Sequence, residues 1–386
     1  MPINDKNFSR LLSLDVFRGI TIILMILVNS PGNRSSFALL EHSMWNGCTL
    51  ADLVFPFFVF IVGVSSVLTL AKQRAKGLSL TFLSGKIIKR TIFLFFIGLL
   101  LNAISLHVDW STLRVLGVLQ RIAICYFFTS ILYLTTRLRT QAIIILLLLI
   151  GYWLAMTLIP VPGYGTHQLT NDGNLAAYVD RLFISSGHLY GHTYDPEGLF
   201  STLPAIATAL LGNLLGAWLL SVDRPSKKLI VMVLAGVVMT LTGWFWGFVF
   251  PINKTLWTSP YVLWTGGLAI LTFALCYWLI EIKQRKRWSR PFEIFGLSAL
   301  TAYVLHVLFL KIQAMILIPM SAETTVNLRL FITQTLFPLS NLKIASLLYA
   351  ISYTLFWFVV LVLIYRKKTI FHVTMIKGLK KGEPPF

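Results

Sequence analysis

The stretch AIIILLLLI at residues 142–150 is apolar at every position and does not alternate between apolar and polar side chains. A transmembrane β-strand needs such alternation, whereas an unbroken apolar run of about 20 residues crosses the hydrocarbon core as a helix. The rest of the 386-residue chain has the same character, being 56% hydrophobic and only 12% charged. Soluble domains carry about a quarter charged residues. The sequence therefore predicts an all-α polytopic membrane protein.

About ten transmembrane helices are expected, and we predict that residues 1–386 form one transmembrane domain. The apolar run that contains Arg18 has no small-residue cleavage site after it, so we interpret it as the first span and not as a signal peptide. The ten predicted spans are residues 14–31, 51–71, 91–106, 114–134, 141–160, 199–220, 229–250, 261–281, 293–313 and 344–365.

The basic residues are unevenly distributed between alternate connections. If both termini are cytoplasmic, the internal segments hold 24 Lys and Arg residues and the external segments hold 4. This asymmetry predicts the orientation by the positive-inside rule. It also explains most of the net charge of +19 without nucleic acid as a partner. The three cysteines lack the spacing of a metal or redox site, and no metal is expected.

Several ionisable and amide side chains fall inside the predicted spans, where they are costly and usually functional. Arg18 lies near the inner end of the first span. Asn29 follows 11 residues later, roughly 17 Å further along an ideal helix. We predict that six such residues gather in the outer half of the membrane: Asn29, Asp52, Asn102, Gln120, Arg121 and His306. The alternative is a structural ion pair between Asp52 and Arg121, with amides that bridge helices.

His42 lies in the external connection between the first two spans. The first span ends in the helix-stop sequence NSPG at 29–32, and Pro56 follows near the start of the second span. These breaks favour a tightly packed or re-entrant loop, and Trp45, Asn46 and Asp52 lie close to His42 along the chain. We find no Walker loop, dinucleotide fingerprint or Gly-x-Ser-x-Gly elbow. The chemistry of the chain is therefore expected to use His, Asn, Asp and Arg.

Five blocks of the sequence together form a recognisable pattern. They are SLDVFRG at 13–19 running through Val28 and Asn29, HSMWNG at 42–47 with ADLVFP at 51–56, LGVLQRIA at 116–123, YDPEG at 194–198, and residues 296–306. These blocks resemble the heparan-α-glucosaminide N-acetyltransferase family of transmembrane acyltransferases, in family order across nearly the whole chain. One departure is Ser298, where the family tends to have Asn, and this concerns the wall of the ninth span.

The resemblance implies transfer of the acetyl group of cytosolic acetyl-CoA, as co-substrate, to the amine of a terminal or free glucosamine-type sugar on the extracytoplasmic side. The lysosomal relatives carry an additional N-terminal luminal region. Its absence here suggests a bacterial relative in the cytoplasmic (inner) membrane. The partners it implies are acetyl-CoA, the amino-sugar acceptor and the lipid bilayer, and a homodimer is left open.

The family's catalytic histidine corresponds to His42 and its essential asparagine to Asn29. His42 would act as a general base toward the sugar amine or as a nucleophile. Asn29 would stabilise the oxyanion, and Asp52 would orient the imidazole. The residues expected to bind substrate are Trp45, Asn46, Arg121, Tyr303 and His306.

The polyanionic nucleotide of the donor is expected at the basic internal face, where Lys and Arg suit phosphate contacts. The residues expected to bind it are Arg18, Lys86, Lys89 and Arg90. Two other function classes compete with the enzyme. An amino-sugar transporter also uses broken helices and polar midplane sites, and a structural or assembly protein would need no such polar set.

Overall fold

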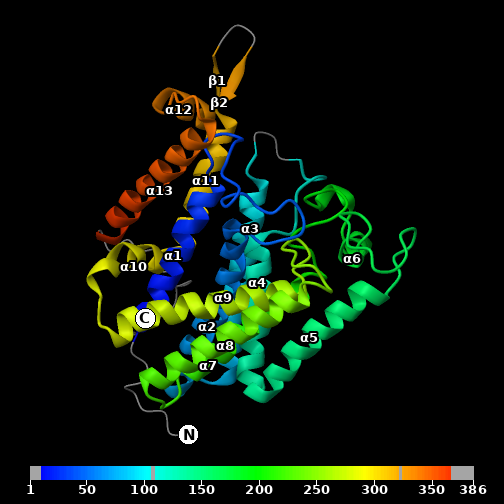
Figure 1. The fold of residues 1–386 in the computed structure, drawn as a ribbon, viewed down its shortest axis with the longest axis vertical. Coiled ribbons are helices and arrows are strands. Elements are labelled where there is room, and N and C mark those ends of the chain that lie inside the picture. Colours follow the sequence, from blue (N-terminus) through cyan, green and yellow to red (C-terminus); the bar gives the residue numbers. More distant parts are fainter. Residues whose placement is uncertain (1–9, 106–108, 321–323, 367–386) are drawn as a thin grey trace.

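The computed structural model describes residues 10–105, 109–320 and 324–366, which form a mainly helical bundle (Figure 1). The long helices are α1 (Leu12–Asn29), α2 (Leu50–Ala75), α3 (Leu80–Ala103), α4 (Val118–Thr135), α5 (Leu138–Leu158), α7 (Thr202–Leu219), α8 (Pro225–Trp246), α9 (Ser259–Tyr277), α11 (Ala299–Met315) and α13 (Leu342–Arg366). The shorter elements are α6 (Leu175–Phe183), α10 (Arg290–Leu297), α12 (Leu328–Leu336), β1 (Leu317–Pro319) and β2 (Thr325–Asn327).

Eight helices in the described part of the chain are long and apolar enough to cross a membrane. A ninth span results if the bent pair formed by 287–297 and α11 counts as one. The prediction of a helical multi-pass membrane protein is confirmed. The predicted number of ten is not confirmed, because eight or nine helices of the described residues meet this criterion. The cytoplasmic termini stay a prediction, since residues 1–9 and 367–386 lie outside the described residues.

Two helices differ from the predicted spans. Helix α3 begins at Leu80 and not near residue 91, so Lys86, Lys89 and Arg90 lie on its N-terminal half and not in a connection. The predicted ninth span, 293–313, is bent by 68° at Ser298, between α10 and α11. The Ser298 amide still bonds to carbonyls of α10, while the Ser298 carbonyl accepts the first bond of α11. One residue thus ends one helix and starts the next.

Helix α2, which carries Asp52, packs closely against α7 at two glycines. A Cβ at Gly63 would lie 1.9 Å from the carbonyl oxygen of Ala209 on α7, and one at Gly212 would lie 2.2 Å from that of Phe60. Small residues allow this approach in lipid, where no hydrophobic force pulls helices together. Helices α1 and α10 cross in the same way, because a Cβ at Gly19 would lie 1.8 Å from the Phe292 carbonyl oxygen.

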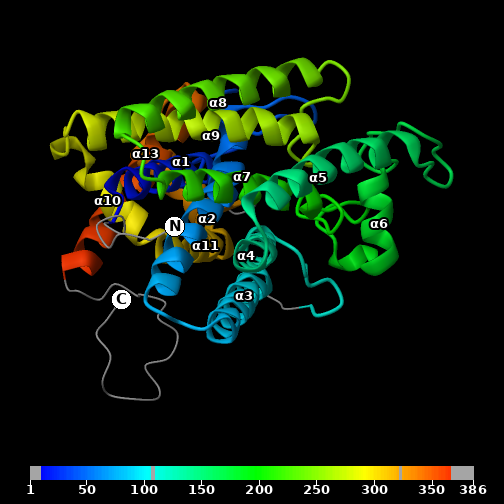
Figure 2. The ribbon, with the colours of Figure 1, turned by 90° about the horizontal axis from the view of Figure 1, so that it is seen from below.

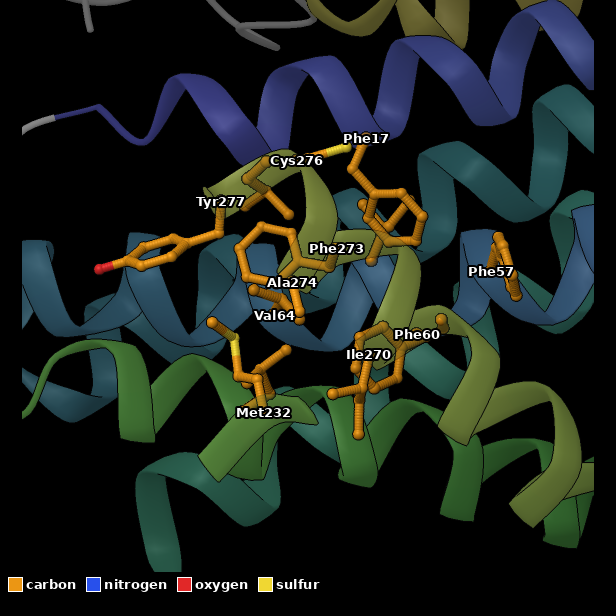
Figure 3. Close-up of a cluster of buried hydrophobic side chains, with 14 of the residues drawn as sticks. Phe17, Phe57, Phe60, Val64, Met232, Ile270, Phe273, Ala274, Cys276 and Tyr277 are labelled. Carbon is orange, nitrogen blue, oxygen red and sulfur yellow. The ribbon is translucent and has the colours of Figure 1, made fainter. Parts of the chain in front are cut away.

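The largest apolar cluster joins α1, α2, α8 and α9 (Figure 3). Phe17 of α1 lies 5.5 Å from Phe57 of α2 and 6.0 Å from Phe273 of α9, centroid to centroid. Seen from below, α8 and α9 run side by side along one face of the bundle (Figure 2). This packing holds α2, which carries Asp52, against α1 and the C-terminal half of α9.

The connections predicted to be external contact one another. The amide of Gly47 donates to the carbonyl of Ile252 (2.7 Å), which joins the α1–α2 and α8–α9 connections. The indole of Trp45 donates to the carbonyl of Leu169 (2.8 Å), which joins the α5–α7 connection, where α6 lies. The sequence did not predict α6 or the hairpin β1–β2. The first loop is thus bonded to two neighbouring connections, although many of its side chains are exposed and the tightly packed loop predicted from the sequence is not confirmed.

Candidate active site

The site is organised by a buried carboxylate at the start of α2. Asp52 is fully buried, and its Oδ2 accepts bonds from the amides of Ser43 and Thr49 (3.0 Å each) and the Thr49 hydroxyl (3.1 Å). The bond from the Thr49 amide is the carboxylate half of a capping box. The N-terminus of a helix also favours negative charge. Oδ2 is therefore occupied by loop donors, while Oδ1 is left for side chains.

His42 takes one place at Oδ1. Its Nδ1 lies 2.7 Å from Asp52 Oδ1, and half of the imidazole is exposed. A carboxylate at this distance accepts the Nδ1 proton, which fixes the tautomer with an unprotonated Nε2. The predicted pairing of Asp52 with His42 is present in the structure. The exposed Nε2 is free to accept a proton or attack a carbonyl.

Lys254, from the α8–α9 connection, is the third member of this cluster. Its Nζ lies 3.3 Å from Asp52 Oδ1, 3.0 Å from His42 Nδ1 and 3.4 Å from His42 Nε2. We did not predict this residue. A signal for it exists, since Lys254 is one of only four basic residues in the predicted external segments. We refer to His42, Asp52 and Lys254 as the triad.

Trp45 and Asn46 hold the His42 loop against neighbouring connections. Besides its bond to the Leu169 carbonyl, the ring of Trp45 packs edge-on against that of Tyr194, with centroids 6.0 Å apart. The Asn46 side-chain oxygen accepts a bond from Asn253 (3.2 Å), next to Lys254. Both residues therefore position the loop, and both lie beside the triad as predicted for substrate contact.

A second ionic cluster lies in the YDPEG segment. Arg114 binds Asp195 through two bonds (2.9 and 2.6 Å) and also pairs with Glu197. Burial opposes the charge of Arg114, but the two carboxylates outweigh it and raise the pKa of Arg114 above its usual value. The family resemblance includes residues 194–198, but the sequence analysis assigned no catalytic or binding role to these five residues. In the structure, this segment anchors the entry to α4.

Arg121 does not pair with Asp52, so the predicted structural alternative is wrong. The buried guanidinium donates to the Gly198 carbonyl (3.1 Å) and to the Ser201 hydroxyl. It lies 5.1 Å from the centroid of the Trp257 ring. Its Nε and Nη1 have no hydrogen-bond partner among the described residues. Asp52 instead takes its cation from Lys254, and Arg121 fastens α4 to the start of α7.

The predicted convergence of the intramembrane polar residues is only partly present. Asn102 donates to the carbonyls of Arg114 and Leu116 (2.8 and 2.9 Å), and Gln120 donates to that of Val115 (3.1 Å), so both amides hold the α3–α4 connection. No contact in the described chain joins them to the triad. Their positions along each helix predict a depth in the membrane but not the direction in which the side chains point.

The remaining site predictions concern α1 and α11. Asn29 is the last residue of α1; its side chain is exposed and has no hydrogen-bond partner in the described residues. His306 is buried, with Nδ1 3.1 Å from the carbonyl of Tyr303 and Nε2 unpartnered within the described chain. The Tyr303 and His306 rings pack edge-on, 5.9 Å between centroids. No contact in the described chain ties these three residues to the triad.

The predicted donor-binding residues differ in exposure, since Arg18 and Lys86 are half-buried while Lys89 and Arg90 are exposed. Arg18 bonds to Asp15 (3.2 Å), to the Gly296 carbonyl (3.3 Å) and to Ser65 (2.6 Å), so it joins α1 to α2 and α10. Lys86 lies 4.6 Å from the centroid of the Phe82 ring on its own helix, and Arg90 the same distance from that of Tyr126 on α4. Binding of the donor by these four residues stays a prediction.

The shifted pKa values of Cys48 and Asp180 bear on which side chain can act as nucleophile or base. Burial and the Asp52 carboxylate raise the pKa of the Cys48 thiol to about 12, so this thiol stays protonated and is a poor nucleophile. Burial also raises the pKa of Asp180, on α6, to about 6, although the amides of Leu199 and Phe200 donate to it. The nucleophile or base with an open face is therefore His42.

The chain matches a family model described as heparan-alpha-glucosaminide N-acetyltransferase, catalytic, over residues 10–243. It is 33% identical over 356 residues to the heparan-alpha-glucosaminide N-acetyltransferase of Homo sapiens, covering 78% of this chain and 53% of that protein. The Mus musculus protein of the same name is 31% identical over 354 residues, with 77% and 53% covered. The chain thus spans about half the length of the curated relatives it matches. The family match contains His42 and Asp52 and ends before Lys254.

Proposed function

Because the chain belongs to the heparan-α-glucosaminide N-acetyltransferase family, we propose that it is a transmembrane acetyltransferase. It moves the acetyl group of cytosolic acetyl-CoA to the amine of a terminal or free glucosamine-type sugar on the extracytoplasmic side. The observation that carries this proposal is the contact of His42 Nδ1 with Asp52 Oδ1 at 2.7 Å, which leaves Nε2 open at the surface of the triad. A base oriented by a carboxylate is the arrangement that acyl transfer uses.

In the direct route, His42 Nε2 removes a proton from the neutral sugar amine as the amine nitrogen bonds to the thioester carbon. The C=O electron pair moves to oxygen. When it returns, the C–S bond breaks, and the proton held by Nε2 passes to the departing sulfur. In the two-step route, Nε2 itself bonds to the carbonyl carbon, and the C–S bond breaks to release the thiolate. The amine then attacks the acetyl-imidazole, the C–Nε2 bond breaks, and the proton lost by the amine neutralises the thiolate. Both routes give an amide and a free thiol.

The donor enters from the opposite end of the bundle in this proposal. Lys89 and Arg90 contact the phosphates, since both are exposed on the N-terminal half of α3. Arg18 lies close enough to Arg90 for their charges to interact, so it adds positive potential to the same region. The acyl arm then follows α1 toward Asn29, roughly 17 Å away along an ideal helix.

The test is an acetylation assay with purified protein, radiolabelled acetyl-CoA and glucosamine. We expect labelled N-acetylglucosamine from the wild type and none above background from His42→Ala. Lys343→Ala is the control, because Lys343 is exposed at the start of α13 and lies outside the segments proposed to bind substrate. Equal turnover by His42→Ala and wild type would exclude His42 as the reacting group. Trapping an acetylated His42 peptide after mixing with the donor alone would select the two-step route.

Transport of an amino sugar is the second candidate, and the 68° break between α10 and α11 favours it, because broken helices form transporter sites. Proteoliposomes distinguish the two functions. Sugar uptake without acetyl-CoA supports transport, whereas uptake or modification that requires acetyl-CoA supports the enzyme.

The acceptor and the location of the protein are the finer parts of the proposal. Residues 161–198 face the His42 loop through Tyr194 and Leu169, so we propose that this segment selects the sugar. A screen of glucosamine, chitosan oligomers and heparan-type termini tests it. We further propose the bacterial cytoplasmic membrane as the location, which membrane fractionation of the source cell tests.

A further inference from the structure

The geometry points to Lys254 as the donor that stabilises the oxyanion of the acetyl-transfer step, a role that rests on the proposed function. The first observation is its position. Nζ lies 3.4 Å from His42 Nε2, the only ring nitrogen free to react. A carbonyl carbon that approaches Nε2, or an amine held by it, brings the carbonyl oxygen within reach of this ammonium group. Donors 2.7–3.1 Å from the oxyanion, about the length of an ordinary hydrogen bond, are what such stabilisation requires.

The second observation is the number of donors that Lys254 has to spare. An ammonium group carries three N–H donors. One points to Asp52 Oδ1 at 3.3 Å. The 3.0 Å contact with His42 Nδ1 uses none of the others, because Nδ1 already carries a proton that it donates to Asp52. The 3.4 Å contact with the unprotonated Nε2 takes at most one more N–H. One N–H of Lys254 is therefore left for a ligand beside the reacting nitrogen.

The third observation is that Lys254 pairs with a fully buried carboxylate. Its Nζ lies 3.3 Å from Asp52 Oδ1, which holds the ammonium group beside His42. An ammonium group has no lone pair, so it donates to the acetyl oxygen and does not compete with the sugar amine as a nucleophile. Asp52 thus has two functions, since it orients the imidazole and positions Lys254 as a donor.

Asn29 competes with Lys254 for this role. The resemblance assigns the family's essential asparagine to Asn29, but its side chain contacts neither His42 nor Asp52 in the described chain. It ends α1, on the route proposed for the donor. We assign Asn29 to the approach of the acyl arm and Lys254 to the charge that develops on its carbonyl.

The experiment compares Lys254→Met, Lys254→Arg and a chemically modified Lys254→Cys. Lys254→Met keeps the side-chain length and removes both charge and donors, so kcat should fall about 10²–10³-fold, as for loss of one oxyanion donor, with the KM for acetyl-CoA unchanged. Lys254→Arg should retain a larger share of kcat. Lys343→Met, at an exposed lysine in the first turn of α13, is the control and should match the wild type. Thermal unfolding of each variant shows whether the loop remains folded.

Alkylation of Lys254→Cys separates a donor from a mere counter-charge. Treatment with 2-bromoethylamine restores an ammonium group with N–H donors, whereas bromoethyltrimethylammonium restores the charge without donors. We expect the first reagent to raise kcat and the second to leave it low, with mass spectrometry to confirm both modifications and treated wild type as control. Equal recovery with both reagents, or no recovery with either, overturns the assignment, as does a Lys254→Met kcat within threefold of wild type. If the wild type itself transfers no acetyl group, the proposed function fails instead.

Discussion

Replacing Asp52 by Asn should abolish acetyl transfer while leaving the fold nearly unchanged. The two carboxylate oxygens have separate partners, since Oδ2 accepts the amides of Ser43 and Thr49 and Oδ1 faces His42 and Lys254. The amide oxygen of Asn can replace Oδ2, because only an acceptor suits two N–H donors. Its NH₂ group then faces His42 Nδ1 and donates to it. The imidazole must adopt the other tautomer, in which Nε2 carries the proton and can neither accept a proton nor attack.

The magnitude follows from this tautomer change. In serine proteases, removal of the negative charge of the catalytic aspartate with unchanged geometry lowers kcat by about 10⁴. We expect a fall in kcat of about 10³–10⁴ for Asp52→Asn in the radiolabel assay. Asp52→Ala should have the same kinetic effect and should also destabilise the protein. It leaves the amides of Ser43 and Thr49 without an acceptor, at about 1 kcal/mol each because both residues are half-buried.

The control is Asp109→Asn, at an exposed carboxylate on another connection, which should retain wild-type kcat and melting temperature. The reasoning is refuted if Asp52→Asn retains kcat within tenfold of wild type. It is also refuted if the kinetic loss appears only together with a fall in Tm as large as that of Asp52→Ala, since the effect would then come from the loop and not from the tautomer.

Three further predictions concern residues around the site. Arg114→Met should lower the unfolding free energy by about 3–5 kcal/mol, because it leaves the buried Asp195 without its cation; an unchanged Tm would contradict this. Asp180 has a pKa raised to about 6, so the neutral form favours folding, and the stabilisation present below about pH 4 is lost as pH rises through 6. Asp180→Asn should therefore be the more stable form at pH 7.5 and equal to wild type near pH 4, as thermal unfolding at both pH values will test. Lys89→Ala with Arg90→Ala should raise the acetyl-CoA KM about tenfold, a loss of about 1.4 kcal/mol, and leave kcat unchanged; an equal KM would remove α3 from donor binding.

The membrane architecture could be predicted because it depends on composition along one dimension. Apolar runs such as 142–150 and the asymmetry of basic residues are properties of the chain itself. The bend at Ser298 could not be predicted, because it depends on packing. It lies where a Cβ at Gly296 would come within 1.9 Å of the Asp15 carbonyl oxygen, so α10 must lie against α1 while α11 follows its own course. The hydropathy pattern of the sequence does not predict such a contact between two helices.

The site was predictable to the extent that its members are close in sequence. His42, Trp45, Asn46 and Asp52 fall within eleven positions, so the loop and the helix start that hold them bring them together. Arg121 shows the opposite case. Its depth in the membrane matched that of Asp52, but depth does not give the direction of a side chain, and Arg121 binds Gly198 and Ser201 instead. Pairing charges by depth alone therefore chose the wrong cation.

The cation that Asp52 does contact could have been found by a different rule. Basic residues are disfavoured in external connections. Each basic residue in a predicted external connection is therefore expected to make a local interaction that stabilises it there. Two of the four show such an interaction: Lys254 contacts Asp52 at 3.3 Å, and Arg181 donates to the carbonyls of Thr193 and Asp172 (2.7 and 3.1 Å), which closes the connection that holds α6. One of the four exceptions to the predicted charge asymmetry, Lys254, is thus a member of the triad. A search among these exceptions would have found the cation that a comparison of depths along the helices missed.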